Sequence, residues 1–345
     1  MKLCLITNYL NKGYINESLI FNQLKTTLNL SPEDIISFHD ENKVYNINKQ
    51  YTHALILLDY NITSYKFILN FLKGLNIPKI FIIDSIPEIH KQLNQEFVDS
   101  YSNIKDYVFS TLKTNEWFEI YNLADGLVFY NTIDHYEFLK IHDLQHKKIA
   151  IIPPSLGKEE DIVFNPNNVI KNTNIGFNGD PSYPNGIFNY GFINSKIPNY
   201  KFSIYGSHGK NHQKSESILN HIIENCDNAN FYGKLKNTKS FYLNNFLYYD
   251  FVIYNSFSFF MYKSLINGVI PIINKNTSSS LYLKDYPFTA EYMNIDSFHH
   301  QIQRIQNTSV SELISIMSNV VQNLKPLNDK NLKSLYYELA QSINI

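Results

Sequence analysis

Residues 250–273 constrain the fold more than any other stretch, reading DFVIYNSFSFFMYKSLINGVIPII. A short apolar run predicts a strand over Phe251–Tyr254, helical spacing predicts a helix over Phe259–Asn267, and Gly268 is expected to end that helix. A second buried strand is predicted over Val269–Ile273. We expect an amphipathic helix with one apolar face made of Phe259, Tyr262, Leu265 and Ile266. The stretch is therefore a βαβ unit.

Such a unit supports two interpretations. A short loop between a parallel strand and a helix N-terminus is where α/β sheets bind phosphorylated ligands. Asn255 and Ser256 break the apolar run and are good helix-capping residues. The same pattern is also expected of a unit that only builds core.

Strand and helix patterns alternate along the whole first half of the chain. Strands are predicted at Lys2–Thr7, Asp34–Phe38, Ala54–Leu58, Lys79–Ile83, Gly126–Tyr130 and Lys148–Ile152. Helices are predicted at Glu17–Leu28, Ser64–Leu75, Glu88–Tyr101, Asn115–Leu123 and Asp134–Leu144. This alternation predicts a parallel, doubly wound sheet.

The pattern restarts after a polar segment, Gly157–Asn172, which is the best linker candidate. Further strands are predicted at Asn174–Asn178, Lys201–Tyr205, Ala229–Tyr232 and Phe288–Tyr292. Further helices are predicted at Gly186–Asn194, Lys214–Asn225, Thr238–Leu247, Ile295–Ile305, Ser311–Leu324 and Asp329–Ser342. We therefore expect an α/β protein with two Rossmann-like doubly wound domains facing a cleft, over residues 1–155 and 172–328. Residues 329–345 form a terminal helix that either packs back on the first domain or closes the core of the second.

Composition argues against several classes of protein. The 345 residues are 44% hydrophobic and 18% charged, which suits a well-cored protein. Formal net charge is −1 and Arg304 is the only arginine, whereas duplex-reading proteins usually carry a basic face rich in arginine. Cys4 lies in an apolar strand and Cys226 is the only other cysteine, so we expect a reducing cytoplasm. The first residues fit a strand rather than a signal peptide, and no apolar run approaches the ~20 residues of a membrane span.

Familiar catalytic motifs are absent from the sequence. It contains no GxGxxG, Walker loop, HExxH, CxxC pair or GxSxG. His208 and His212, and the adjacent His299 and His300, are interpreted as surface or packing residues rather than ligands, so no metal is predicted.

Three loops in the second half combine small residues with turn formers at predicted strand ends. Glycine lets a ligand approach backbone N–H groups closely, and lysine can neutralise a diphosphate. Strand-to-helix turns need the same residue types for other reasons, but three such loops in one domain favour a bound nucleotide. The candidate contacts in these loops are Asn178, Gly179, Ser182, Tyr205, Gly206, Lys210, Gly233, Lys234 and Leu235.

With these features the sequence resembles the GT-B glycosyltransferases, and within them the phage DNA β-glucosyltransferases. The likeness rests on the segments KIFIIDSIP at 79–87, NFYGKL at 230–235 and MYKSLINGVIPII at 261–273. It implies a nucleotide-sugar donor, most often a UDP-sugar, held by the second domain without a metal.

The resemblance has one departure, at Lys263. Enzymes of this kind usually place a glutamate there to hold the ribose hydroxyls, and a lysine cannot accept those hydrogen bonds although it can pair with phosphate. Either the donor is held differently, or it is not a UDP-sugar, or the chain binds no donor. Ser256, Ser258 and Ser264 are the candidate replacements.

Asp84 is the catalytic candidate, because it ends an apolar strand and the resemblance carries the family's aspartate base onto it. In an inverting transfer it would take the acceptor hydroxyl's proton. The competing interpretation makes Asp84 a helix N-cap. Acceptor-side candidates are Tyr9, Asn11, Lys12 and Glu88.

The predicted function is glycosyl transfer from a nucleotide-sugar to an acceptor hydroxyl, with Asp84 as base. One alternative is a phage-type enzyme that glucosylates a hydroxymethylated DNA base. Others are a GT-B-like binding protein without catalysis and a sugar-nucleotide epimerase.

Overall fold

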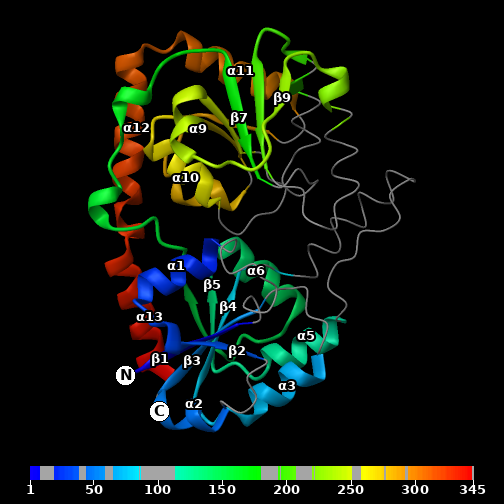
Figure 1. Cartoon of the computed structure of the whole chain (residues 1–345), viewed down its shortest axis with the longest axis vertical. Coiled ribbons are helices and arrows are strands. Elements are labelled where there is room, and N and C mark those ends of the chain that lie inside the picture. Colours follow the sequence, from blue (N-terminus) through cyan, green and yellow to red (C-terminus); the bar gives the residue numbers. More distant parts are fainter. Residues whose placement is uncertain are drawn as a thin grey trace. The chain divides into compact units, whose positions relative to one another are not determined.

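The computed structural model describes residues 1–7, 19–38, 44–58, 65–84, 86, 113–179, 193–194, 196–206, 220, 222–250, 258–275, 277–291 and 294–343, to which every structural statement below refers (Figure 1). They form two compact units. Unit 1 contains the described residues up to Glu159 together with Pro326–Ile345, and unit 2 contains Glu160–Lys325.

Unit 1 is built on a six-stranded sheet in the order β2-β1-β3-β4-β5-β6, with every pair parallel. Its strands are β1 (Leu3–Thr7), β2 (Ile35–Ser37), β3 (His53–Leu57), β4 (Lys79–Ile83), β5 (Gly126–Phe129) and β6 (Lys148–Ile151). All residues of β1, β3 and β5 are buried, as expected for parallel strands covered on both faces.

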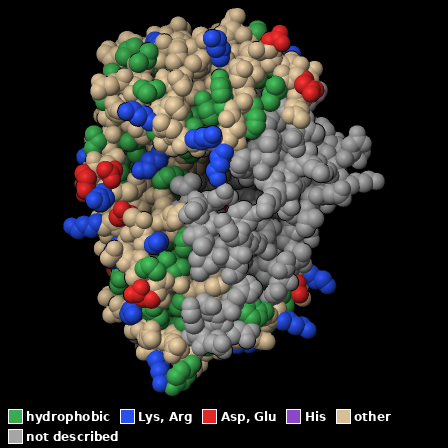
Figure 2. Space-filling view, viewed as in Figure 1, with side chains coloured by type: hydrophobic (Ala, Val, Ile, Leu, Met, Phe, Trp, Pro, Cys, Tyr) green, Lys and Arg blue, Asp and Glu red, His purple; other side chains and the backbone are tan. Residues whose placement is uncertain are grey.

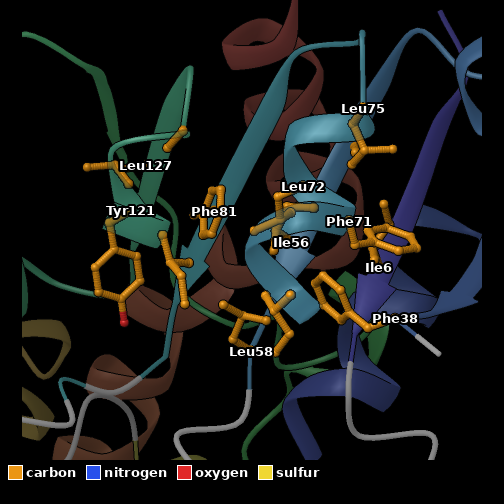
Figure 3. Packing of buried hydrophobic residues seen from close by; sticks show 14 of the residues in the cluster. Ile6, Phe38, Ile56, Leu58, Phe71, Leu72, Leu75, Phe81, Tyr121 and Leu127 are labelled. Carbon is orange, nitrogen blue, oxygen red and sulfur yellow. The ribbon is translucent and has the colours of Figure 1, made fainter. Parts of the chain in front are cut away.

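Helices α1 (Leu19–Leu28), α2 (Val44–Gln50), α3 (Tyr65–Gly74), α5 (Thr114–Tyr121) and α6 (Thr132–Ile141) connect these strands. Figure 3 shows side chains from β1, β3, β4 and α3 meeting in one cluster that includes Ile6, Ile56, Leu72 and Phe81. Burial of such a side chain contributes roughly 1.5–3 kcal/mol, so this cluster is the main source of the unit's stability.

The last helix, α13 (Asp329–Ile343), belongs to unit 1. It packs on α1 and on β5 and β6, and the Thr27 hydroxyl donates a 2.8 Å hydrogen bond to the Asp329 carboxylate. Its buried positions, Leu332, Tyr336 and Leu339, recur at helical spacing.

Unit 2 has a second parallel six-stranded sheet, in the order β12-β11-β10-β7-β8-β9. Its strands are β7 (Asn174–Asn178), β8 (Lys201–Tyr205), β9 (Ala229–Phe231), β10 (Leu247–Asp250), β11 (Ile270–Asn274) and β12 (Thr289–Ala290). Its helices are α9 (Thr238–Asn244), α10 (Phe259–Ile266), α11 (Ile295–Asn307) and α12 (Val310–Leu324). Read from β9, this is the strand order of dinucleotide-binding folds, and it reverses between β7 and β10.

The polar segment predicted to be a linker is ordered and contributes to the core of unit 2. Ile162 and Phe164 are buried, and the backbone N–H of Asn165 donates to the Ile266 carbonyl at the end of α10. Gly268 ends α10 as predicted, with φ +86°, and an added Cβ there would lie 2.8 Å from the Asn165 carbonyl oxygen. Only glycine meets both requirements without strain.

The α/β prediction with two parallel sheets is confirmed, and most predicted elements match within a few residues. A strand beside β7, β10, was not predicted at Leu247–Asp250, and the helix predicted over Thr238–Leu247 ends at Asn244. The run NFLYYDFVIY is mostly apolar or aromatic, so its composition does not show where in it a strand begins. The short helix α2 was not predicted.

The expectation of an amphipathic α10 was wrong as well. Met261, Tyr262, Ser264, Leu265 and Ile266 are all buried, so the helix is covered on nearly every side. The predicted helix Glu88–Tyr101, most of Gly186–Asn194 and of Lys214–Asn225, and residues 251–254 lie outside the described residues. No described helix has the length and apolar character to cross a membrane.

Candidate functional site

The carboxyl edge of the unit 2 sheet brings the three predicted loops together. The Gly179 N–H donates to the Tyr205 carbonyl at 3.1 Å, and the Gly206 N–H donates to the Gly233 carbonyl at 3.0 Å. These two hydrogen bonds thus hold the segments that follow β7, β8 and β9 beside one another, just beyond the strands. These two N–H groups are therefore engaged in hydrogen bonds between neighbouring loops.

Gly233, at this edge, has open space beside it. Its φ is +69°, and a Cβ built there would meet no atom of the described residues within 4 Å. A ligand can therefore approach the backbone here. Lys234 next to it is exposed and Leu235 is half-buried.

An aromatic cluster fixes the ends of β8 and β9. The Tyr205 and Tyr232 rings stack with centroids 5.0 Å apart, and Phe241 of α9 meets Tyr205 edge-on at 5.2 Å. Phe241 also meets Phe260 of α10 at 5.0 Å, so α9 and α10 are packed together. Burial raises the pKa of the Tyr205 hydroxyl above its ordinary value.

The switch point between β7 and β10 contains an acid that sequence reasoning missed. Leu247 pairs with Ile175 and Tyr248 with Gly176, which brings Asp250, at the end of β10, beside the end of β7. Asp250 is only 2% exposed. Its Oδ1 accepts a 2.7 Å hydrogen bond from the hydroxyl of Ser258, which is 6% exposed. The strand was predicted from Phe251 onward, so Asp250 was not singled out as a site residue from the sequence.

Ser258 is the N-cap residue of α10, yet its side chain makes no capping hydrogen bond to that helix. The hydroxyl donates to Asp250 instead, so the Ser258 side chain does not cap the first N–H groups of α10. The N–H groups at a helix N-terminus, together with the helix dipole, favour an anion.

Two further predicted contacts lie on α10. Lys263 is half-buried, with its Nζ 5.5 Å from the centroid of the Phe259 ring. Ser264 is completely buried, and its hydroxyl oxygen has no hydrogen-bond partner among the residues that the structure describes. Burial raises the pKa of the neighbouring Tyr262 hydroxyl well above its ordinary value, and the Asp250 carboxylate adds to that rise.

Asn178 lies at the end of β7, where its carbonyl accepts a 3.3 Å hydrogen bond from the Tyr248 hydroxyl. At the carboxyl edge of unit 2, at or just beyond the ends of β7, β8 and β9, the structure therefore places Asn178, Gly179, Tyr205, Gly206, Gly233, Lys234 and Leu235. Ser258 directly precedes α10, whereas Lys263 lies in the last turn of that helix and the Ser264 carbonyl accepts from the Val269 N–H, just before β11 begins. Ser182, Lys210 and Ser256 lie outside the described residues, as do Tyr9, Asn11, Lys12 and Glu88.

Asp84 lies in unit 1, directly after β4, and is half-buried. Ile83 pairs with Phe129, so Asp84 comes beside the carboxyl end of β5. Asn131 caps α6 there: its Oδ1 accepts from the Asp134 N–H at 2.9 Å, and its side-chain amide donates to the buried Asp134 carboxylate at 2.6 Å. No group of three or more His, Cys, Asp or Glu side chains that could hold a metal occurs among the described residues.

No protein-family description matches the chain, and no curated protein sequence matches it. Solved structures do. A trehalose-6-phosphate synthase, described in work on glycosyl transfer with retention, matches with a TM-score of 0.68 at 9% identity over 99% of both chains. A UDP-forming α,α-trehalose-phosphate synthase from Burkholderia xenovorans, in complex with glucose-6-phosphate, matches at 0.69 and 9% identity, over 99% of this chain and 100% of that one.

Sucrose-phosphate synthase from Thermosynechococcus elongatus matches with a TM-score of 0.68 at 13% identity, over 87% of this chain and 76% of that one. These proteins are GT-B glycosyltransferases. The identities are low and the matches extend over most of the chain, so they establish architecture. The chain has the GT-B glycosyltransferase fold, as the sequence resemblance predicted.

Proposed function

We propose that the protein is a glycosyltransferase that moves a sugar from a nucleotide-sugar donor to an acceptor hydroxyl. The observation that carries the proposal is the switch point of unit 2, where Asp250 and Ser258 fix the N-terminus of α10 without capping it. Switch points of this strand order are the usual ligand sites of such sheets. The fold shared with UDP-forming synthases supports the same assignment.

In this proposal the donor diphosphate lies against the first turn of α10. The N–H groups there and the ammonium group of Lys263 offset the negative charge that grows on the leaving group. The open backbone at Gly233 and the cation of Lys234 complete the donor site with the other predicted loop residues. A UDP-sugar is the first donor to test, because two of the similar structures are described as UDP-forming.

The proposed chemistry is a single displacement with Asp84 as base. The acceptor oxygen bonds to the anomeric carbon as the bond to the diphosphate breaks, and the electron pair of that bond stays on the diphosphate. The acceptor's proton passes to the Asp84 carboxylate. This path inverts the anomeric centre, whereas one similar enzyme is described as retaining, so product configuration discriminates between the two paths.

The experiment combines a donor panel with product analysis. Purified protein is incubated with nucleotide-sugars and acceptors, and products are identified by mass spectrometry and anomeric NMR. Asp84→Asn is expected to lose transfer by at least about 100-fold, since a general base contributes about 10²–10⁴. Asp143→Asn, which alters an exposed carboxylate of the same unit, is the matched control. Full transfer by a folded Asp84→Asn protein would refute the role of Asp84.

Lys263 favours a second candidate, a GT-B-like protein that binds without catalysis. A lysine cannot accept hydrogen bonds from ribose hydroxyls, so a donor would lack that contact. Thermal-shift screening separates the candidates, because stabilisation by a donor together with turnover supports the enzyme. A nucleic-acid acceptor with a hydroxymethylated base is the other alternative, and labelled DNA containing that base belongs in the acceptor panel.

A further inference from the structure

Positive charge is concentrated around one edge of unit 2. Residues 227–285 contain six lysines and three carboxylates, of which Asp227 and Asp285 are exposed and the third is that of Asp250. The Asp250 carboxylate is 2% exposed and accepts a hydrogen bond from Ser258, so it adds little negative charge to the surface. The overall net charge of −1 hides this asymmetry.

Three of the lysines stand close together where β9 leads into α9. Lys234, Lys236 and Lys239 are all exposed. No ion pair to a carboxylate is found for Lys236 or Lys239 in the part of the chain that the structure describes. Lys239 lies in the first turn of α9, the end at which the helix dipole disfavours a cation, so its charge does not stabilise that helix.

An exposed aromatic face adjoins these lysines. Tyr232 directly follows β9, the edge strand of the sheet, and is 57% exposed. Its ring lies 5.0 Å from that of Tyr205 at an interplanar angle of 17°, so one face is backed and the side chain is held in place. Leu243, on α9, is 51% exposed as well. A large exposed ring that is held rigid is a ready stacking surface.

The neighbouring helix continues the same charge. Phe260 of α10 packs against Phe241 and Tyr242 of α9, and α10 carries Lys263. In the area of Figure 2 where Figure 1 places α9 and α10, the charged side chains are Lys or Arg.

We propose that Tyr232, Lys236 and Lys239 form a binding surface for single-stranded nucleic acid. Lysines spaced along the chain as Lys236 and Lys239 are can contact successive phosphates of one strand, and an unpaired base can stack on the exposed face of the Tyr232 ring. The exposed ring favours a single strand over a duplex, since duplex bases are already stacked on each other. These three residues are not part of the proposed donor site, so the inference holds whether or not the protein transfers sugar.

The test measures binding of a fluorescein-labelled 16-nucleotide oligo-dT by anisotropy, with the full-length protein, between about 50 and 300 mM salt. Each phosphate contact to a single strand adds about −0.7 to the slope of log K against log salt. The double variant Lys236→Ala/Lys239→Ala should therefore flatten the slope by about 1.4 and weaken binding about 25-fold at 0.1 M salt. Tyr232→Ala should weaken binding at least about fivefold, and Tyr232→Phe should bind like the wild type.

Lys66→Ala/Lys73→Ala is the matched control, since it removes two exposed lysines from α3 of unit 1 and should leave binding unchanged. Donor-induced thermal shifts should be the same for the Lys236→Ala/Lys239→Ala protein and the wild type, which separates this surface from the donor site. Equal binding by the wild type and the Lys236→Ala/Lys239→Ala protein would overturn the proposal. So would a Tyr232→Ala protein that binds as well as Tyr232→Phe, or a wild type that prefers the duplex of the same length.

Discussion

Ser258→Ala gives the sharpest test of the switch-point geometry. The lost interaction is a 2.7 Å hydrogen bond to Asp250, between side chains that are 6% and 2% exposed. Hydrogen bonds to charged groups contribute about 1.5–3 kcal/mol, and a buried acceptor left without its donor costs a comparable amount. We therefore expect the variant to lose about 2 kcal/mol of unfolding free energy. Because the serine makes no capping bond to α10, no further loss from capping is expected.

Urea and thermal unfolding, followed by fluorescence, measure this loss. Unit 2 is of a size at which 1 kcal/mol shifts the melting temperature by roughly 2–4 °C, so a shift of about 4–8 °C is expected. Asp250→Asn completes a double-mutant cycle. Its amide oxygen still accepts from Ser258, but a neutral hydrogen bond contributes only about 1 kcal/mol, so Ser258→Ala should cost about 1 kcal/mol less in that background.

An alternative explanation is that Ser258 caps α10 in solution. In that case the substitution would cost about 1 kcal/mol whether residue 250 is Asp or Asn. A coupling energy below about 0.3 kcal/mol, or a melting temperature unchanged by Ser258→Ala, would refute the assigned hydrogen bond. The account of the α10 N-terminus would then fail with it.

Three other substitutions test separate features. Gly268→Ala should cost more than about 2 kcal/mol of unfolding free energy, because it combines a left-handed backbone with a Cβ 2.8 Å from a carbonyl oxygen. Gly233→Ala, with open space around it, should cost only about 1 kcal/mol. Equal losses of the two variants in urea titrations would contradict this. Ser264→Ala should be neutral or stabilise by up to about 1 kcal/mol, since it removes a buried hydroxyl that has no partner, and a clear loss would show that the hydroxyl is used. Burial alone would raise the pKa of Asp34, but hydrogen bonds from Ser31 outweigh it and the pKa is lowered. Because the folded pKa of Asp34 is lowered, its ionised form stabilises the protein fully above the unfolded pKa of about 3.9, and this stability is lost as pH falls through the lower folded pKa. The Asp34→Asn protein should therefore lose less unfolding free energy than the wild type between about pH 5 and pH 2. An unchanged pH profile of stability would refute this.

Much of the fold could be predicted because parallel strands buried on both faces are short, continuous apolar runs. Lys79–Ile83, Asn174–Asn178 and Lys201–Tyr205 were predicted to the residue, since polar or turn residues bound each of them. Gly268 was read correctly as a helix end, because few other residues tolerate that backbone.

The errors arose where the sequence lacks such boundaries. The ten residues from Asn245 to Tyr254 are mostly apolar or aromatic, and pairing with β7 was needed to show that Leu247–Asp250 forms a strand. Because the strand was predicted from Phe251 onward, the buried Asp250 at the switch point was not recognised. Tertiary burial of α10 on nearly all sides likewise cannot be read from a helical period.

The candidate site shows the same division. The glycine-containing loops were predicted at strand ends and do follow β7, β8 and β9, but the sequence could not show that the Gly179 and Gly206 N–H groups hold neighbouring loops together. It also could not show that the Ser264 hydroxyl is buried. Hydrogen-bond partners of this kind depend on which strands become neighbours.

The central claim is that the carboxyl edge of unit 2 holds a nucleotide-sugar, and calorimetric titration of the protein with UDP-glucose and a panel of other nucleotide-sugars tests it most directly. We predict saturable one-to-one binding of at least one of these donors, weakened at least about tenfold by Lys263→Ala, which removes the cation at the proposed phosphate site. The exposed substitution Lys148→Ala in unit 1 should leave binding unchanged. Absence of binding across the panel, or equal affinity in the wild type and the Lys263→Ala protein, would contradict the proposed donor site.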